Sequence, residues 1–97
     1  MKEFLILHYG FVEPTDEIMA AWNEWFEAIG DRVVAMRGVG DGVEISKTGT
    51  TELPFGRNSL TGYNLIKAES LEKARQIAAT NPFIDSIRVY EVRSNAQ

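Results

Sequence analysis

The stretch Lys2-Glu3-Phe4-Leu5-Ile6-Leu7-His8-Tyr9 decides the fold of this chain. Successive side chains of an extended strand point to opposite faces, so one face carries Phe4, Ile6 and His8 and the other carries Leu5, Leu7 and Tyr9. Both faces are therefore largely apolar. A strand of this kind is covered on both sides, which predicts a central strand over residues 2–9.

Two helices are predicted outside this strand. Thr15 is a good N-cap residue, acidic residues follow it, and apolar residues recur at helical spacing until Gly30. This pattern predicts a helix over residues 15–29, whose inner stripe is Ile18, Trp22, Trp25, Phe26 and Ile29. Ser70 caps a second helix over residues 70–79, which ends before Asn81-Pro82 because a proline disfavours helix in the residue before it.

The remaining segments predict three more strands. Residues 33–46 are rich in β-formers and predict one long strand with a glycine bulge or tight turn near Gly38-Val39-Gly40-Asp41-Gly42. Residues 48–59 are polar, contain Pro54, and predict an ordered loop. Strands follow at 60–68 and 86–92, and the polar tail Ser94-Asn95-Ala96-Gln97 is expected to fray.

The order strand, helix, two strands, helix, strand is the split βαβ pattern. It predicts an α+β, ferredoxin-like βαββαβ domain over residues 1–97, with an antiparallel sheet and both helices on one face. The other sheet face is too apolar to stay in water and the chain has no third layer to cover it. We therefore expect a homodimer joined through that face.

Composition excludes several function classes. The 97 residues contain no cysteine and one histidine, so a disulfide, a thiolate zinc site and a cysteine nucleophile are ruled out and no metal site is expected. The net charge is −4 and the basic residues form no run, which disfavours nucleic-acid binding. The apolar run at the N-terminus is too short for a signal peptide or a membrane span, and a cytoplasmic location without membrane contact is expected.

Several motifs, taken in order, resemble the YCII-related family and within it the DGPF-like branch. They are Phe4-Leu5-Ile6-Leu7, the tryptophan-bearing helix that ends at Gly30, Leu53-Pro54-Phe55, Gly62-Tyr63-Asn64-Leu65-Ile66 and the helix from Ser70 to Ala79. The resemblance implies a dimeric α+β barrel, in which two ferredoxin-like subunits pack sheet to sheet and each has a cleft between helices and sheet. It also implies that no cofactor is needed, since some members of the wider superfamily are cofactor-free enzymes acting on small aromatic or lactone compounds.

The chain departs from that family at the residues that matter for catalysis. Members thought to be catalytic carry a histidine on the first helix, where this chain has about Met19, and an aspartate where it has Asn81-Pro82-Phe83. The namesake DGPF segment is replaced by Glu52-Leu53-Pro54-Phe55. The acid–base pair of the family therefore does not transfer to this chain.

Four residues are the best candidates for a binding site: His8, Trp22, Tyr63 and Asn81. They lie at elements whose ends converge at one edge of a split βαβ domain, and they offer aromatic walls with few polar groups, which suits a small, largely apolar ligand. Each also has a structural interpretation, in which the tryptophan is core and the lone histidine is a satisfied strand residue. The glycine-rich segment 38–42 leads into a strand and not a helix, so nucleotide binding is disfavoured.

Three functions stay open from the sequence. The first is a non-catalytic protein of YCII type that binds a small molecule. The second is a cofactor-free isomerase, lyase or small monooxygenase that polarises an aromatic or lactone substrate with His8, Tyr63 and Asn81. The third is a protein-interaction module whose uncovered sheet face pairs with a different chain.

Overall fold

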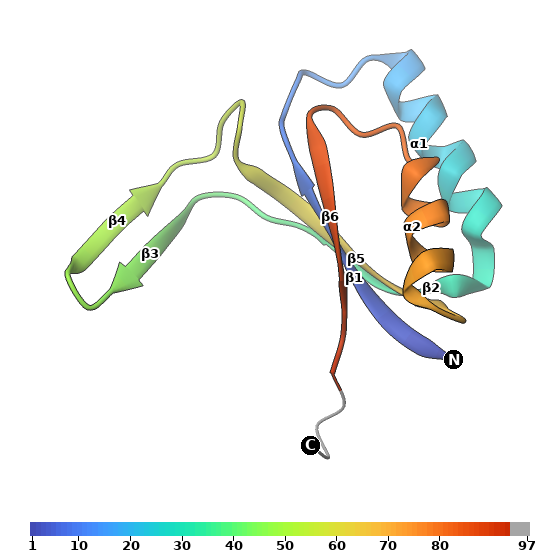
Figure 1. The fold of residues 1–97 in the computed structure, drawn as a ribbon. Helices are drawn as coiled ribbons and strands as arrows, with labels where there is room; N and C mark the ends of the chain where they lie inside the picture. The colour runs from blue at the N-terminus through green and yellow to red at the C-terminus, as the bar shows by residue number, and fades with distance from the viewer. Residues whose placement is uncertain (94–97) are drawn as a thin grey trace.

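The computed structural model describes residues 1–93 and gives two helices and six strands in them (Figure 1). Their order and bounds are β1 (Lys2–Tyr9), α1 (Asp16–Ile29), a 3₁₀ turn (Gly30–Arg32), β2 (Val33–Gly38), β3 (Gly42–Ser46), β4 (Gly49–Leu53), β5 (Leu60–Ala68), α2 (Leu71–Ala79) and β6 (Ser86–Glu91). The predictions for both helices and for the strands at 2–9, 60–68 and 86–92 are confirmed to within a residue or two. The prediction for residues 94–97 lies outside the described residues.

Four strands form one antiparallel sheet in the order β2-β5-β1-β6, with β1 in the interior as its two apolar faces require. Both helices lie against the same face of this sheet (Figure 1). This arrangement confirms the predicted α+β, ferredoxin-like fold. Neither helix in residues 1–93 is long and apolar enough to cross a membrane.

The predicted caps set the helix starts. Thr15 Oγ1 accepts a hydrogen bond from the Ile18 N–H at 3.2 Å, and Ser70 Oγ accepts one from the Lys73 N–H at 3.1 Å. Each bond satisfies one of the backbone donors that the first turn of a helix leaves free. Gly30, with φ of +48°, ends α1 in a conformation that favours glycine.

The core lies between the helices and the sheet. Phe4, Ile6 and Ile66 are completely buried, and register pairs Phe4 with Ile66 across β1 and β5. Trp25 contributes the largest buried side chain of α1 and also joins the two helices, because its indole N–H donates to Thr80 Oγ1 at 2.9 Å and to the Ile77 carbonyl at 3.3 Å. This tryptophan is therefore a structural residue with its polar atom satisfied.

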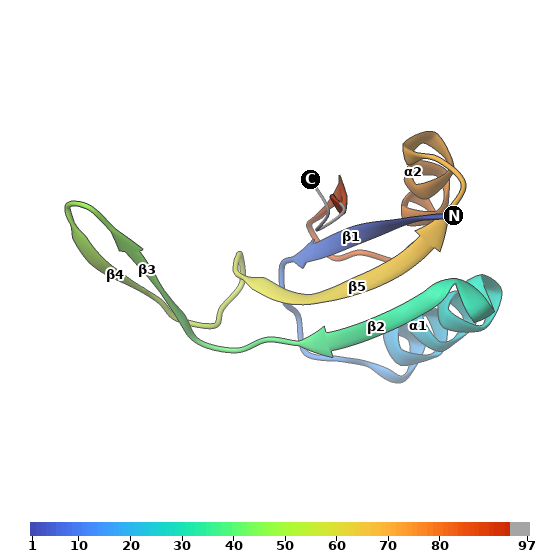
Figure 2. The same ribbon diagram turned by 90° about the horizontal axis from the view of Figure 1, so that it is seen from below.

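The prediction of one strand over residues 33–46 is wrong. Strand β2 ends at Gly38, and after Val39-Gly40-Asp41 the chain enters β3, which pairs with β4 in a separate two-stranded sheet. The loop predicted for residues 48–59 is correspondingly wrong over Gly49–Leu53, which is β4. We call the hairpin of β3 and β4 the arm, and it extends well beyond the main sheet (Figures 1 and 2).

The arm could not be predicted from the sequence, because all ten of its strand residues are exposed and its second strand lacks the alternation of apolar and polar residues. Its geometry is nevertheless local. A two-residue turn at Lys47-Thr48 leads to Gly49, whose φ of +145° favours glycine, and the Phe55 N–H donates to Asp41 Oδ1 at 2.7 Å across the base of the arm.

The sheet face opposite the helices carries a group of apolar and aromatic side chains bordered by charged ones, and we call it the open face. None of the helices and strands within residues 1–93 packs over it (Figures 1 and 2). Arg88 lies there with its guanidinium carbon 4.9 Å from the centre of the Tyr9 ring. The apolar and aromatic members of the open face, placed by strand register, are Leu5, Leu7, Tyr9, Ala35, Tyr63, Leu65 and Tyr90.

Candidate functional site

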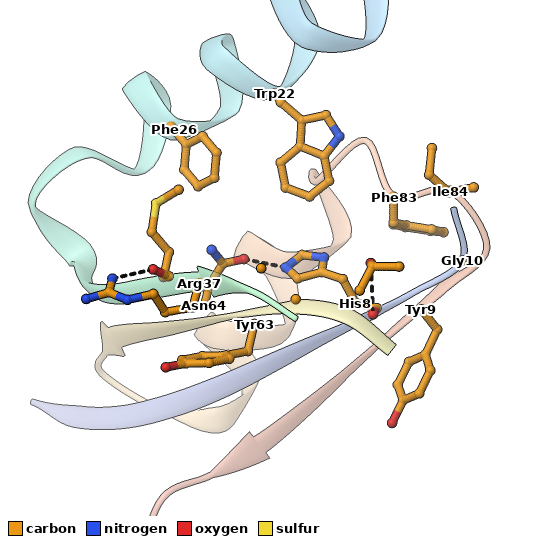
Figure 3. Close-up of a pocket in the computed structure, with 14 residues that line it drawn as sticks. His8, Tyr9, Gly10, Trp22, Phe26, Arg37, Tyr63, Asn64, Phe83 and Ile84 are labelled. Carbon is orange, nitrogen blue, oxygen red and sulfur yellow. Dashed lines mark hydrogen bonds between the residues drawn. The ribbon is translucent and has the colours of Figure 1, made fainter. Parts of the chain in front are cut away.

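A cavity of about 390 Å³ opens between α1 and the helix-covered face of the sheet, near the end of β1 (Figure 3). We call it the central cavity. Helix α1, three strands of the main sheet and the segment before β6 all contribute to it. The side chains that bear on its chemistry are His8, Trp22, Phe26, Met36, Asn64, Phe83 and Ile84.

Aromatic rings of α1 form one wall. Trp22 and Phe26 are four residues apart, so they project from the same side of the helix, and their ring centres are 5.7 Å apart. The Trp22 ring also meets the His8 ring in an edge-to-face contact at 5.2 Å. The spacing that predicted a helical core stripe thus places Trp22 and Phe26 beside the sheet, where they bound the cavity.

The opposite side of the cavity carries a polar pair from two neighbouring strands. Register places Asn64 of β5 directly opposite Ile6, and His8 is the next residue of β1 on that same face. His8 Nε2 is hydrogen-bonded to Asn64 Oδ1, and the two residues are 7% and 3% exposed. Because an amide oxygen only accepts, this bond assigns the ring proton to Nε2 and leaves Nδ1 as an acceptor.

Burial lowers the pKa of His8 below its ordinary value, while the hydrogen bond with Asn64 acts in the opposite direction and is the smaller effect. The imidazole is therefore neutral at pH 7. Nδ1 is buried and makes no hydrogen bond to any residue that the structure describes. The result is a fixed, uncharged polar pair beneath two aromatic rings.

Two glycines bring the backbone close around the cavity. Gly62, opposite His8, lies so near β2 that an added Cβ would be 2.9 Å from the Arg37 carbonyl oxygen. Gly10 has φ of +103°, and an added Cβ would lie 2.6 Å from the Cβ of Asp85. Gly10 therefore lets the end of β1 pass against the segment that carries Phe83 and Ile84.

The four residues predicted for the site do not all point into the cavity. His8 and Trp22 meet there through their side chains (Figure 3). Tyr63 contributes to the lining, but its ring lies on the other side of the sheet from Trp22 (Figure 3). Asn81 is 4% exposed and is absent from the cavity lining, and its side-chain amide makes no hydrogen bond within residues 1–93.

Sequence reasoning missed Asn64, the partner of His8. The sequence pattern could have identified Asn64, because it alternates with Gly62 and Ile66 on the inward face of its strand, where a buried polar side chain needs a hydrogen-bond partner. In residues 1–93 no three histidine, aspartate or glutamate side chains come together as metal ligands would. Arg37 and Thr61 also belong to the cavity lining, but His8 and Asn64 are the two lining side chains that are hydrogen-bonded to each other.

Comparisons with known proteins give the fold and no family. No protein family profile matches the chain, and no curated protein matches it. Among solved structures, the chain is similar to 5-chloro-2-hydroxyhydroquinone dehydrochlorinase from Burkholderia phenoliruptrix AC1100, in complex with 2,5-dihydroxybenzoquinone. The TM-score is 0.60 and the sequence identity 14%, over 97% of this chain and 96% of the dehydrochlorinase.

Proposed function

We propose that this protein binds a small, largely apolar molecule in the central cavity. The observation that carries the proposal is the combination of an aromatic wall, Trp22 and Phe26, with one fixed and uncharged polar pair, His8 and Asn64. Small-molecule sites typically have this make-up, and a volume of about 390 Å³ lies within their usual range. The similar dehydrochlorinase is in complex with a one-ring compound, which supports a ligand of that size.

A cofactor-free enzyme acting on an aromatic or lactone compound is the second candidate. It is favoured by His8, because a lowered pKa keeps the imidazole neutral and thus able to accept a proton at pH 7. Membership of the DGPF-like branch of the YCII-related family is part of this proposal, because some members of the wider superfamily are cofactor-free enzymes. The helix-one histidine and the aspartate of its catalytic members are replaced here, which favours binding over catalysis.

We also propose that the protein is a homodimer in which the open face packs on a second copy. The tyrosines and leucines of that face form an apolar surface, and a hollow of about 670 Å³ continues it from Tyr9 to Leu53 and Leu60 at the base of the arm. Two-stranded hairpins are marginally stable alone in water, so the exposed arm is also expected to gain support from the partner. The interface should bury about 1,200 Å² or more.

Titration of ¹⁵N-labelled protein with small aromatic compounds and lactones tests the binding proposal. We expect shift changes to centre on the Trp22 indole, the Asn64 amide and the backbone near His8. The variant Trp22→Ala should weaken binding, whereas Leu71→Ala, an exposed change on α2, should not. Binding that leaves these signals unchanged, or that maps to the open face, would contradict a site in the central cavity.

A further inference from the structure

The orientation of the Asn64 amide identifies the chemical group that a ligand would have to present. Its oxygen is turned toward His8 and its nitrogen away from it (Figure 3). Asn64 Nδ2 makes no hydrogen bond to any residue from 1 to 93, although the residue is 3% exposed and lines the cavity. Unlike His8 Nδ1, this nitrogen is not a fully buried atom, so an acceptor atom inside the cavity can reach its N–H groups.

We propose that Asn64 Nδ2 donates a hydrogen bond to an acceptor oxygen of an uncharged aromatic ligand, and that His8 is the positioning residue which holds the amide in this orientation. The inference rests on the proposed function and names its ligand class: an aryl ketone, an aryl lactone or a quinone, with the ring against Trp22 and Phe26 and the carbonyl oxygen at Asn64.

The direction of the hydrogen bond from His8 to Asn64 implies that the ligand must carry a hydrogen-bond acceptor. His8 Nε2–H already donates to Asn64 Oδ1. Turning the amide over would require the other tautomer of His8, with its proton on Nδ1, where no residue from 1 to 93 accepts it. His8 Nδ1 is the remaining acceptor, and it is buried. Of His8 and Asn64, only the Asn64 amide N–H is therefore available for a hydrogen bond to a ligand.

The surroundings also favour a ligand without charge. His8 is neutral at pH 7 because burial lowers its pKa. Arg37 belongs to the cavity lining, but register pairs it with Tyr63, so its side chain points toward the open face. Its guanidinium donates a hydrogen bond to the Met36 carbonyl at 2.6 Å. A carboxylate at Asn64 would lose its hydration without gaining a cationic partner.

Acetophenone and α-methylstyrene provide a matched test, because they share size and shape and differ in a C=O against a C=CH₂ group. We expect both to shift the Trp22 indole signal in ¹⁵N spectra. Acetophenone should bind about 2- to 12-fold more tightly, the ratio that one neutral hydrogen bond provides. The side-chain NH₂ signals of Asn64 should move with acetophenone and stay in place with α-methylstyrene.

Variants separate recognition from folding. Asn64→Leu should bind the two compounds equally, while His8→Gln, whose amide N–H can replace Nε2–H, should keep the preference and His8→Leu should reduce it. Equal binding by the unchanged protein, or a preference retained in Asn64→Leu, would overturn the role of Asn64 and leave the cavity proposal standing. If neither compound shifts the cavity signals, the proposed function itself fails. If Asn64→Leu does not fold, the Asn64 NH₂ signals of the unchanged protein decide.

Discussion

Gly10→Ala should destabilise the protein strongly, because this position combines a glycine conformation with a close contact. A non-glycine residue at φ of +103° is strained by about 1–3 kcal/mol. The new Cβ would lie 2.6 Å from the Cβ of Asp85, far inside the normal carbon–carbon contact of about 3.5–4.0 Å, and the overpacking should cost about 1–3 kcal/mol more. Alanine restricts the unfolded chain and recovers about 0.4–1 kcal/mol. The net loss should be about 3 kcal/mol.

Urea unfolding followed by tryptophan fluorescence measures this loss, at one fixed protein concentration because an oligomer makes stability concentration-dependent. With a slope of about 1–3 kcal/mol per molar urea, the midpoint should fall by about 1–3 M. Gly40→Ala is the control, since an added Cβ there meets nothing within 4 Å, and it should match the unchanged protein or be slightly more stable. A loss below about 1 kcal/mol for Gly10→Ala, or an equal loss in both variants, would refute the reasoning.

Three further predictions concern the site and the open face. The free energy of unfolding should fall as the pH drops from 7 toward 5, because the unfolded chain protonates His8 near its ordinary pKa of 6.5 while burial opposes protonation in the folded chain. Urea unfolding at a series of pH values measures this, and His8→Gln should make the free energy of unfolding less dependent on pH over this range. Trp22→Ala should weaken ligand binding about tenfold in fluorescence titrations, because Trp22 lines the cavity. Trp25→Phe should leave ligand affinity unchanged but lower the free energy of unfolding by about 1 kcal/mol, because the indole hydrogen bonds are lost. Leu7→Lys should yield monomers in light scattering, and an unchanged dimer would exclude the open face as the interface.

Burial explains which elements could be predicted from the sequence. Strand β1 and both helices contact the core, so their apolar residues repeat with the period of the element. The arm has no such requirement, and Gly49–Leu53 therefore carries no pattern that separates a strand from a polar loop. A hairpin without core contacts is visible only through its turn, here the unremarkable Lys47-Thr48.

The site was predictable to the extent that it follows from alternation within one element. His8 and Trp22 line the cavity and could be named from the sequence because each lies on the inward face of its own strand or helix. Tyr63 alternates with Leu65, and its ring accordingly lies on the other side of the sheet from Trp22 (Figure 3). The pairing of His8 with Asn64 depends on the register of β1 with β5, which joins residues 56 positions apart and which no local pattern specifies.

The identity of that partner also bears on the choice between binding and catalysis. A histidine that acts as a general base becomes an imidazolium, and a carboxylate beside it commonly stabilises the charge. His8 has a neutral amide instead, and burial already opposes its protonation. A proton taken from a substrate would thus leave a buried cation, and burial and the Asn64 hydrogen bond, the effects that act on the His8 pKa within residues 1–93, supply no negative charge to balance it. An uncharged ligand that accepts a hydrogen bond from Asn64 requires no such separation of charge, so binding is the function that this pair supports best.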